Sequence, residues 1–319
     1  MNIHQRVLEA EKRIRPYIRM TSVDFSPYLS KLCGCKVYLK LESEQLTGSF
    51  KIRGALNKIL SLTPEQRRSG VVAYSTGNHA LGVAHASQLL GVKSIIFVPY
   101  TVSKAKLDAL RFYPSEIKIY KKSDEETEIT KYARAFAQKK HMTFVSPYND
   151  LDVVAGQGTI GYEILQQVPG ADAVFACVGG GGLISGIGGF IKEAKKMVKI
   201  VACSPRVFPS MHESVRLGKI VILPIRDTFS DGSVGNNELD TITFPLCQSY
   251  VDDWLLATER QIKVALRLLI EKHYKLVEGA AAVTLAALMN NKKCYQGKNV
   301  VLVLCGSNIG IDKIRKVIR

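Results

Sequence analysis

The stretch around which this chain is organised reads EQLTGSFKIRGAL and covers residues 44–56. It follows a strand-like run at residues 36–41 and leads into an amphipathic helix. Small and hydroxyl residues precede Phe50 and Lys51, so the lysine lies at a loop-to-helix junction, where N–H groups point outward and burial lowers an ammonium pKa. A lysine held in this way can act as a nucleophile or base, whereas a lysine judged alone is more commonly a solvated one.

Composition places the chain among ordinary globular proteins. It has 319 residues, 46% apolar and 23% charged, enough for a large core and two domains. No apolar run is long enough to cross a bilayer and the first residues do not form a signal peptide, so we expect a cytoplasmic protein without membrane contact. The seven cysteines show no metal-ligand spacing, which argues against disulfides and a zinc site.

The net charge of +16 raises the question of a nucleic-acid partner. The basic residues are spread along the chain, mostly in pairs, and they do not alternate with aromatic residues. We therefore expect solvated basic faces and no nucleic-acid site, and a small molecule bearing a carboxylate as the partner.

Strand-like and helical patterns alternate along most of the chain. Strands are expected at residues 37–41, 70–74, 94–98, 117–120, 142–145, 173–178, 200–204 and 300–304. Helices are expected at residues 3–14, 53–60, 80–90, 104–112, 125–139, 183–196, 259–272 and 280–289, and after the run 155–159 as far as Val168. Residues 211–241 read as irregular. This alternation predicts an α/β fold with a mostly parallel sheet covered by helices on both faces.

A run of four glycines directly follows one apolar strand and opens a helix. Its members are Gly179, Gly180, Gly181 and Gly182. Four glycines let the backbone wrap around a ligand with its N–H groups directed inward, which suits a phosphate at a helix N-terminus. The order is not G-x-G-x-x-G, and no P-loop lysine follows, so a single phosphate fits better than a nucleotide. The alternative is a tight strand-to-helix turn.

Three further features carry polar groups at or near strand ends. One is the run Ser75, Thr76, Gly77, Asn78 and His79. It can hold a carboxylate and, through its Asn amide, a ring hydroxyl, or it can simply cap a helix. The run CGSN at residues 305–308 can meet a heteroaromatic nitrogen, or it is a buried cysteine before a turn. Glu278 lies among apolar residues, as a helix N-terminal charge or as a group aimed at a site.

Together these features describe a lysine-reactive carbonyl, one phosphate, a flat heteroaromatic ring and a carboxylate-bearing substrate. Pyridoxal 5′-phosphate with an amino acid meets all four requirements. Five ordered motifs, at residues 47–55, 75–79, 155–159, 179–182 and 305–308, make the chain resemble one family. It is similar to the fold-type-II (tryptophan-synthase-β-like) pyridoxal-phosphate enzymes, within them the threonine/serine dehydratase and serine racemase group.

The resemblance implies two open, mostly parallel twisted sheets flanked by helices, with the active site between two domains. A large domain would comprise residues 1–47 and 148–319, and a small mobile domain residues 48–147. The family also suggests a homodimer.

The resemblance further implies roles for individual residues. Lys51 would bind the cofactor covalently and later remove the Cα proton, and Phe50 would back the ring. Asn78 would bond the ring 3′-hydroxyl, Glu278 would lie near the cofactor, and Cys305 would face the pyridine nitrogen, with Ser307 as the second choice. The phosphate would be held by Gly179, Gly180, Gly181, Gly182 and Leu183. The substrate carboxylate would be held by Ser75, Thr76, Gly77, Asn78 and His79.

The activity implied is a threonine/serine dehydratase, that is, an ammonia-lyase that converts a hydroxy-amino acid to a 2-oxo acid and ammonia. The alternatives are a serine racemase, because the Thr76 hydroxyl could return a proton, and a dehydratase of another substrate such as 3-hydroxyaspartate. An inert or nucleic-acid-binding relative is the alternative outside enzymes. Ser204 and Ser210 stand where relatives carry an acidic pair for a divalent cation, so we expect no metal.

Overall fold

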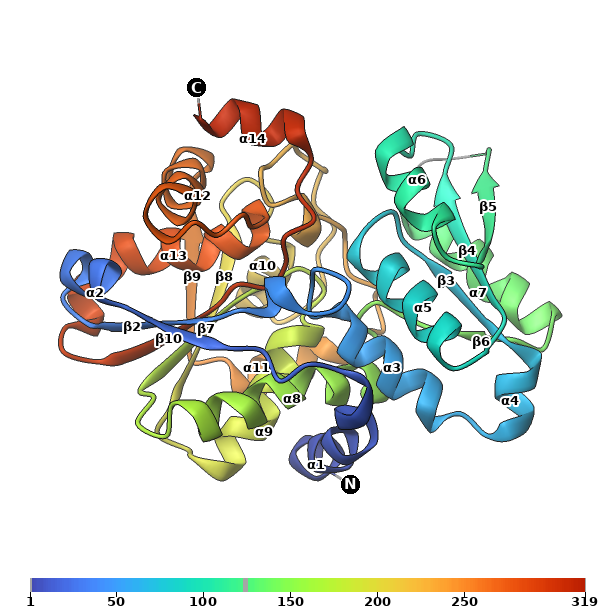
Figure 1. Cartoon of the computed structure of the whole chain (residues 1–319), viewed down its shortest axis with the longest axis horizontal. Helices are drawn as coiled ribbons and strands as arrows, with labels where there is room; N and C mark the ends of the chain where they lie inside the picture. Colours follow the sequence, from blue (N-terminus) through green and yellow to red (C-terminus); the bar gives the residue numbers. More distant parts are fainter. Residues whose placement is uncertain (1, 123–125, 319) are drawn as a thin grey trace.

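The chain folds into two lobes, each built on one open β-sheet (Figure 1). The computed structural model describes residues 2–122 and 126–318. In the larger sheet the strand order is β1 (Val23–Ser26), β2 (Lys36–Lys40), β10 (Asn299–Val303), β7 (Ala173–Cys177), β8 (Lys199–Pro205), β9 (Asp253–Ala257). In the smaller sheet it is β5 (Glu116–Tyr120), β4 (Ser94–Pro99), β3 (Val71–Tyr74), β6 (Thr143–Phe144). Among these strands only β1 and β2 pair antiparallel, which confirms two open, mostly parallel sheets.

Helices flank both sheets. They are α1 (Ile3–Ile14), α2 (Pro27–Cys33), α3 (Lys51–Ser61), α4 (Pro64–Ser69), α5 (Asn78–Leu89), α6 (Lys104–Arg111), α7 (Glu126–Lys139), α8 (Leu151–Gln167), α9 (Gly182–Ala194), α10 (Ser210–Leu217), α11 (Thr243–Tyr250), α12 (Glu259–His273), α13 (Gly279–Asn291) and α14 (Ile311–Ile318). In the large lobe α12 and α13 lie on one side of the sheet and α8 and α9 on the other (Figure 1). The small sheet packs against α5 and α7. Residue 125, where the sequence pattern places the start of the helix expected at residues 125–139, lies outside the described residues.

Helix α8 begins earlier than the sequence pattern predicts. Asp150 is its N-cap and accepts hydrogen bonds at Oδ1 from the backbone N–H groups of Asp152 and Val153, at 2.8 and 3.2 Å. The run 155–159 therefore lies inside the helix. Its glycines serve helix packing: a Cβ at Gly156 would lie 2.6 Å from the Arg53 carbonyl oxygen of α3. Glycine lowers helix propensity, and for that reason the pattern reads as a loop.

The sequence patterns do not predict every helix and strand of the structure. Residues 211–241 are not irregular throughout, because they contain most of α10 (Ser210–Leu217), which is capped at its C-terminus by Gly218 with φ +70°. The sequence pattern also does not indicate strand β9, because this strand lies at the edge of the sheet and its residues are mostly half-buried. An edge strand of this kind does not show the continuous apolar run of a central parallel strand.

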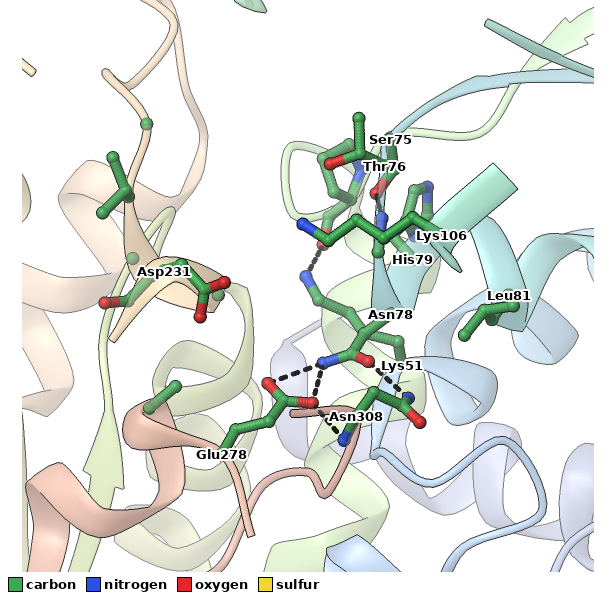
Figure 2. A pocket seen from close by; sticks show the side chains of 18 of the residues that line it. Lys51, Ser75, Thr76, Asn78, His79, Leu81, Lys106, Asp231, Glu278 and Asn308 are labelled. Carbon is green, nitrogen blue, oxygen red and sulfur yellow. Dashed lines mark hydrogen bonds between the residues drawn. The ribbon is translucent and has the colours of Figure 1, made fainter. Parts of the chain in front are cut away.

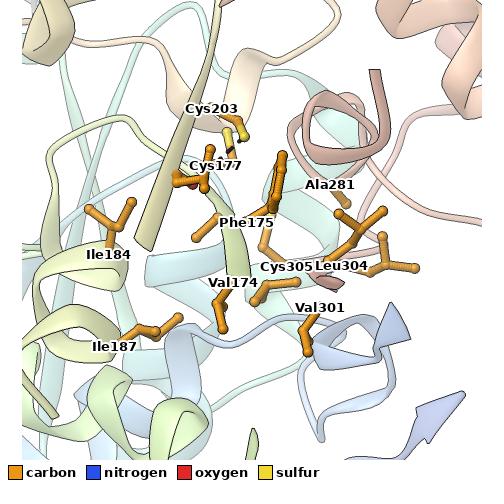
Figure 3. Close-up of a cluster of buried hydrophobic side chains, with 14 of the residues drawn as sticks. Val174, Phe175, Cys177, Ile184, Ile187, Cys203, Ala281, Val301, Leu304 and Cys305 are labelled. Atoms are coloured by element: carbon orange, nitrogen blue, oxygen red, sulfur yellow. Dashed lines mark hydrogen bonds between the residues drawn. The ribbon is translucent and has the colours of Figure 1, made fainter. Parts of the chain in front are cut away.

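The core of the large lobe packs strands β7, β8 and β10 against α9 and α13 (Figure 3). Phe175, Val301 and Ile184 are completely buried, and burying an apolar side chain of this kind stabilises the fold by roughly 1.5–3 kcal/mol. Cys177, Cys203 and Cys305 belong to the same cluster. All seven cysteines lie among the described residues and are free thiols, and only Cys294 is exposed.

The two lobes meet where α3 begins and where the chain returns from β6 to α8. Helix α3 packs against α8 of the large lobe and also against α5 of the small lobe. The division into residues 1–47 with 148–319 and residues 48–147 stays a prediction. Over the described ranges, no helix is both long and apolar enough to cross a membrane.

Candidate active site

Lys51 is the first residue of α3 and lines a cavity of about 490 Å³ between the lobes. The turn before it is anchored to the end of β10: the Phe50 N–H donates to the Cys305 carbonyl at 3.1 Å. Gly48 has φ +67°, and a Cβ there would lie 2.8 Å from Asn308 Oδ1, so this turn requires glycine. Lys51 Nζ donates to the Pro147 carbonyl at 2.9 Å. The lysine on which the sequence centres is thus held inside a cavity.

The loop after β3 forms one wall of this cavity. Ser75, Thr76, Gly77, Asn78 and His79 all line it. Ser75 Oγ accepts a hydrogen bond from the Gly77 N–H at 3.1 Å, and α5 then begins at Asn78. The first N–H groups of a helix have no partner within the helix, so this end of α5 can bind an anion.

A hydrogen-bond network joins this loop to α13 and to the segment after β10 (Figure 2). Asn78 Nδ2 donates to both Glu278 oxygens, at 2.9 and 3.1 Å. Glu278 Oε1 also accepts from the Asn308 N–H at 2.8 Å, and Asn308 Nδ2 donates to Asn78 Oδ1 at 2.7 Å. Burial raises the pKa of the Glu278 carboxyl above its ordinary value, against the opposing effect of these donors. Asn78 is therefore fixed before any ligand reaches it.

The His79 side chain serves the protein interior. It is buried, and its Nε2 lies 2.9 Å from the Val145 carbonyl oxygen, to which a neutral imidazole donates. Burial, with a contribution from the nearby Lys51 charge, lowers the pKa of His79 to about 3. The imidazole is neutral at physiological pH, so a carboxylate at this wall would meet the N–H of residue 79 and not a histidinium.

The glycine run lies between β7 and α9, and Gly179 and Gly180 line the cavity. Gly181 is the N-cap of α9 with φ +83°. A Cβ at Gly180 would lie 2.4 Å from the ring carbons of Tyr148, and one at Gly179 would lie 2.9 Å from the Ser233 carbonyl oxygen. These glycines let the loop and its N–H groups approach the cavity at a helix N-terminus, an arrangement that fits a phosphate. The cavity is not lined by the three residues that follow in the chain, Gly181, Gly182 and Leu183.

Cys305 and Ser307 differ in where they lie. Cys305 lines the cavity, and burial raises the pKa of its thiol well above the ordinary value, so the group is neutral. Ser307 Oγ donates to the Ser43 carbonyl at 2.9 Å and is not part of the lining. Of the two residues, only Cys305 faces the ligand space.

Several lining residues lie outside the five motifs; among them Tyr148 and residues of the segment 230–236 are candidates from the sequence for contact with the substrate side chain, whereas Lys106 carries no sequence signal. Lys106 on α6 extends toward the space beside Lys51 and Thr76, and Asp231 lies on the opposite wall (Figure 2). Ser233 lies beside the glycine run. Of the two serines at which the resemblance led us to expect no metal, Ser204 donates from Oγ to the Val178 carbonyl, and Ser210 accepts at Oγ from Asn237. No cluster of metal-ligating side chains occurs among the residues that the structure describes.

The fold and the cavity are those of an α/β protein whose lysine, glycine loop and polar walls fit a phosphate-bearing aromatic group. The family model described as pyridoxal-phosphate dependent enzyme matches residues 14–306. The chain is 39% identical to the L-threonine ammonia-lyase of Geobacter sulfurreducens, over 98% of this chain and 77% of that one. It is 37% identical to the catabolic L-threonine dehydratase TdcB of Staphylococcus aureus, over 97% and 90% of the two chains.

Solved structures agree with this match. Maize serine racemase superposes with a TM-score of 0.92 at 30% identity, covering 99% of this chain and 96% of that one. The processed form of threonine deaminase isoform 2 from Solanum lycopersicum gives a TM-score of 0.92 at 32% identity, over 99% and 92%. The chain therefore belongs to the family of pyridoxal-phosphate-dependent enzymes, and its cofactor is pyridoxal 5′-phosphate.

Proposed function

We propose that the chain is a pyridoxal-phosphate-dependent ammonia-lyase that converts L-threonine or L-serine to a 2-oxo acid and ammonia. The observation that carries the proposal is Lys51, held in a cavity between a glycine loop and the Asn78–Glu278 network. The identity of 37–39% to threonine ammonia-lyases and dehydratases over nearly the whole chain supports it. We also propose a cytoplasmic homodimer, as the family suggests.

The cavity residues fit the cofactor, and we assign them as follows. Lys51 is the covalent attachment residue, with Phe50 beside it in the lining. Gly179 and Gly180 hold the phosphate, supported from behind by Gly181, Gly182 and Leu183. Asn78 is the partner of the ring hydroxyl, and Glu278 fixes its amide. Cys305 faces the ring nitrogen as a neutral thiol.

The reaction divides between the cofactor and the protein. When bound, pyridoxal 5′-phosphate supplies an electron sink for negative charge at the substrate Cα. The Lys51 amine takes the Cα proton, a general-base step for which its Nζ is already inside the cavity. The N–H groups and hydroxyls of residues 75–79 hold the substrate carboxylate and so orient the Cα–H bond toward that amine. The Cβ–O bond breaks and the hydroxyl leaves as water with the proton taken from Cα, which leaves an enamine. Its imine tautomer then reacts with one water molecule to give ammonia and the 2-oxo acid.

A panel of hydroxy-amino acids tests this proposal. The purified holoenzyme is supplied with L-threonine, L-serine and threo-3-hydroxyaspartate, and the release of 2-oxo acid is followed over time. We expect 2-oxobutyrate from threonine and pyruvate from serine. Release from 3-hydroxyaspartate alone would contradict the proposed substrate, and no release from any of them would contradict the lyase.

Racemisation of serine is a second candidate activity. It is favoured by the likeness to two serine racemases, from maize and Dictyostelium discoideum, at TM-scores of 0.92 and 0.90. Thr76 lines the same cavity as Lys51 and carries a hydroxyl that can return a proton to Cα. The test compares D-serine formation by the wild type and by Thr76→Ala. Equal formation in both would exclude Thr76 as the proton carrier.

A further inference from the structure

The Tyr148 ring packs against the glycine loop at residues 179–182. A Cβ at Gly180 would lie 2.4 Å from the ring carbons, and one at Gly182 would lie 3.0 Å from Tyr148 Cβ. Tyr148 therefore packs directly on the backbone of the glycine loop, which we propose holds the cofactor phosphate. Tyr148 also follows Pro147, whose carbonyl accepts the hydrogen bond from Lys51. Any shift of Tyr148 moves both the loop and the partner of the lysine.

The tyrosine hydroxyl is fixed by Glu238. The Glu238 N–H donates to Tyr148 Oη at 3.0 Å. The segment before Glu238 also contacts the glycine loop, because Ser233 packs on Gly179. Glu238 thus holds the far end of the ring whose face supports Gly180.

Glu238 is in turn bound by the other lobe. Arg134 lies on α7, which packs on the small sheet (Figure 1), and its Nη2 donates to both carboxylate oxygens of Glu238, at 3.0 and 2.8 Å. Its guanidinium carbon lies 4.5 Å from the ring centre of Phe144 in β6, so the side chain is stacked as well as paired. The exposed fractions of the Arg134 and Glu238 side chains are 38% and 23%, so both are partly shielded from water.

We propose that Arg134 is a positioning residue for the cofactor phosphate: through Glu238 and Tyr148 it ties the small-sheet lobe to the glycine loop at Gly180. This inference rests on the proposed cofactor site. When the ion pair between Arg134 and Glu238 is intact, the Tyr148 ring stays packed against the glycine loop, and the backbone N–H groups of that loop keep their orientation toward the cavity. When the lobes separate and the pair breaks, the loop loses this support and holds the phosphate less tightly. Cofactor retention is thereby coupled to the relative position of the lobes.

The test measures cofactor affinity and not turnover. Pyridoxal 5′-phosphate is titrated into cofactor-depleted protein, and the dissociation constant is read from the absorbance of the bound form. A partly exposed ion pair contributes about 0.2–1 kcal/mol, which is a factor of about 1.4 to 5, so Arg134→Gln should weaken binding by up to about fivefold. Glu238→Gln should do the same, the double variant should be no worse than either single one, and Arg134→Lys should recover part of the loss.

Two controls separate positioning from a general loss of structure. Lys131→Gln removes an exposed positive charge from the same helix and should bind like the wild type. Pyridoxal without its phosphate should lose less affinity in the variants than pyridoxal 5′-phosphate does, since the phosphate is the group that the loop is proposed to hold. The difference in pyridoxal 5′-phosphate affinity between the wild type and Arg134→Gln should also become smaller at about 1 M salt, where the ion pair is screened.

The outcomes separate this inference from the proposed function. Binding by Arg134→Gln equal to the wild type, or an equal loss for pyridoxal and its phosphate, would overturn the positioning role while leaving the enzyme assignment intact. A wild-type protein that forms no bound species with pyridoxal 5′-phosphate would overturn the proposed function and this inference together.

Discussion

His79 lies at the start of α5, where its environment differs sharply from water. Its ring is buried, Nε2 is bonded to the Val145 carbonyl, and the pKa is lowered to about 3, chiefly by burial. In the unfolded chain a histidine has its ordinary pKa of about 6.5. The unfolded state therefore binds the proton first as pH falls. The stability that depends on a neutral His79 is present above about pH 6.5 and is lost progressively as pH falls toward 3.

The first prediction concerns this linkage. Between about pH 7 and pH 5, His79→Gln should lose about 2 kcal/mol less unfolding free energy than the wild type, because glutamine cannot titrate. Urea unfolding of both proteins at the two pH values measures the difference. His141→Asn is the control, since His141 is exposed and has φ +53°, which asparagine tolerates. Parallel pH dependence in wild type and His79→Gln would show that His79 takes up protons in the fold.

Glycines inside helices decide how closely the central elements approach. In α8, Gly156 faces the Arg53 carbonyl of α3, and Gly158 would place a Cβ 2.8 Å from the Gly186 carbonyl oxygen of α9. The backbones touch because no side chain separates them. Since α3 begins at Lys51, the position of α3 against α8 also determines where the lysine side chain enters the cavity.

The second prediction is that Gly156→Ala destabilises the protein by about 1–3 kcal/mol, the usual cost of overpacking a tight contact. It should also lower the fraction of protein that retains cofactor, because α3 must shift. Denaturant unfolding and absorbance of the bound cofactor measure the two effects. Gly170→Ala is the control, since a Cβ at that position meets only the Asn299 side-chain nitrogen, at an ordinary contact distance of 3.6 Å, and Gly170 does not line the cavity. If Gly156→Ala unfolds like the control, the packing role assigned to this glycine is wrong.

The same glycines explain where sequence reasoning failed at the scale of elements. The central strands β3, β4, β7, β8 and β10 were predictable because each is a continuous buried apolar run. The first turns of α8 were not, because the glycines needed for contact with α3 and α9 resemble loop residues. Packing requirements across the chain overrode local propensity there.

A buried cluster of charges joins the elements around the lobe junction. Arg53 on α3 donates to Glu42 beside β2 and to Glu163 on α8, and Lys40 donates to the same Glu163. The side chains of all four residues are completely buried. The basic neighbours, against the effect of burial, lower the pKa of Glu163 to about 2. The cluster fixes α3 from two sides, two residues beyond Lys51.

The third prediction is that Arg53→Met costs about 3–5 kcal/mol of unfolding free energy, because it leaves two buried carboxylates without their main partner. Denaturant unfolding measures the loss. Arg68→Met breaks an ion pair whose side chains are 70% and 72% exposed, and it should change stability by less than about 1 kcal/mol. A similar small loss for Arg53→Met would mean that the cluster does not hold the junction.

For the molecule as a whole, the sequence sufficed for the family and for the motifs that meet in the cavity. The motifs at residues 75–79, 179–182 and 305–308 are local patterns that follow the carboxyl ends of β3, β7 and β10, strands of two sheets that open onto the same cavity. The Asn78–Glu278–Asn308 network and the chain from Arg134 through Glu238 to Tyr148 could not be predicted. Asn78, Glu278 and the run containing Asn308 do stand out in the sequence, but nothing local shows that they pair. Arg134, Glu238 and Tyr148 are likewise far apart in the chain, so only the folded chain brings these partners together.

The central claim is that Lys51 is the residue to which the cofactor is attached. The most direct measurement is borohydride reduction of the purified protein, followed by mass spectrometry of its peptides. We predict that the near-visible absorbance band disappears and that the pyridoxyl group is found on the peptide containing Lys51, while Lys51→Ala shows neither the band nor the adduct. An adduct on another lysine such as Lys106, or a Lys51→Ala protein that keeps both the band and 2-oxo-acid release, would contradict this account.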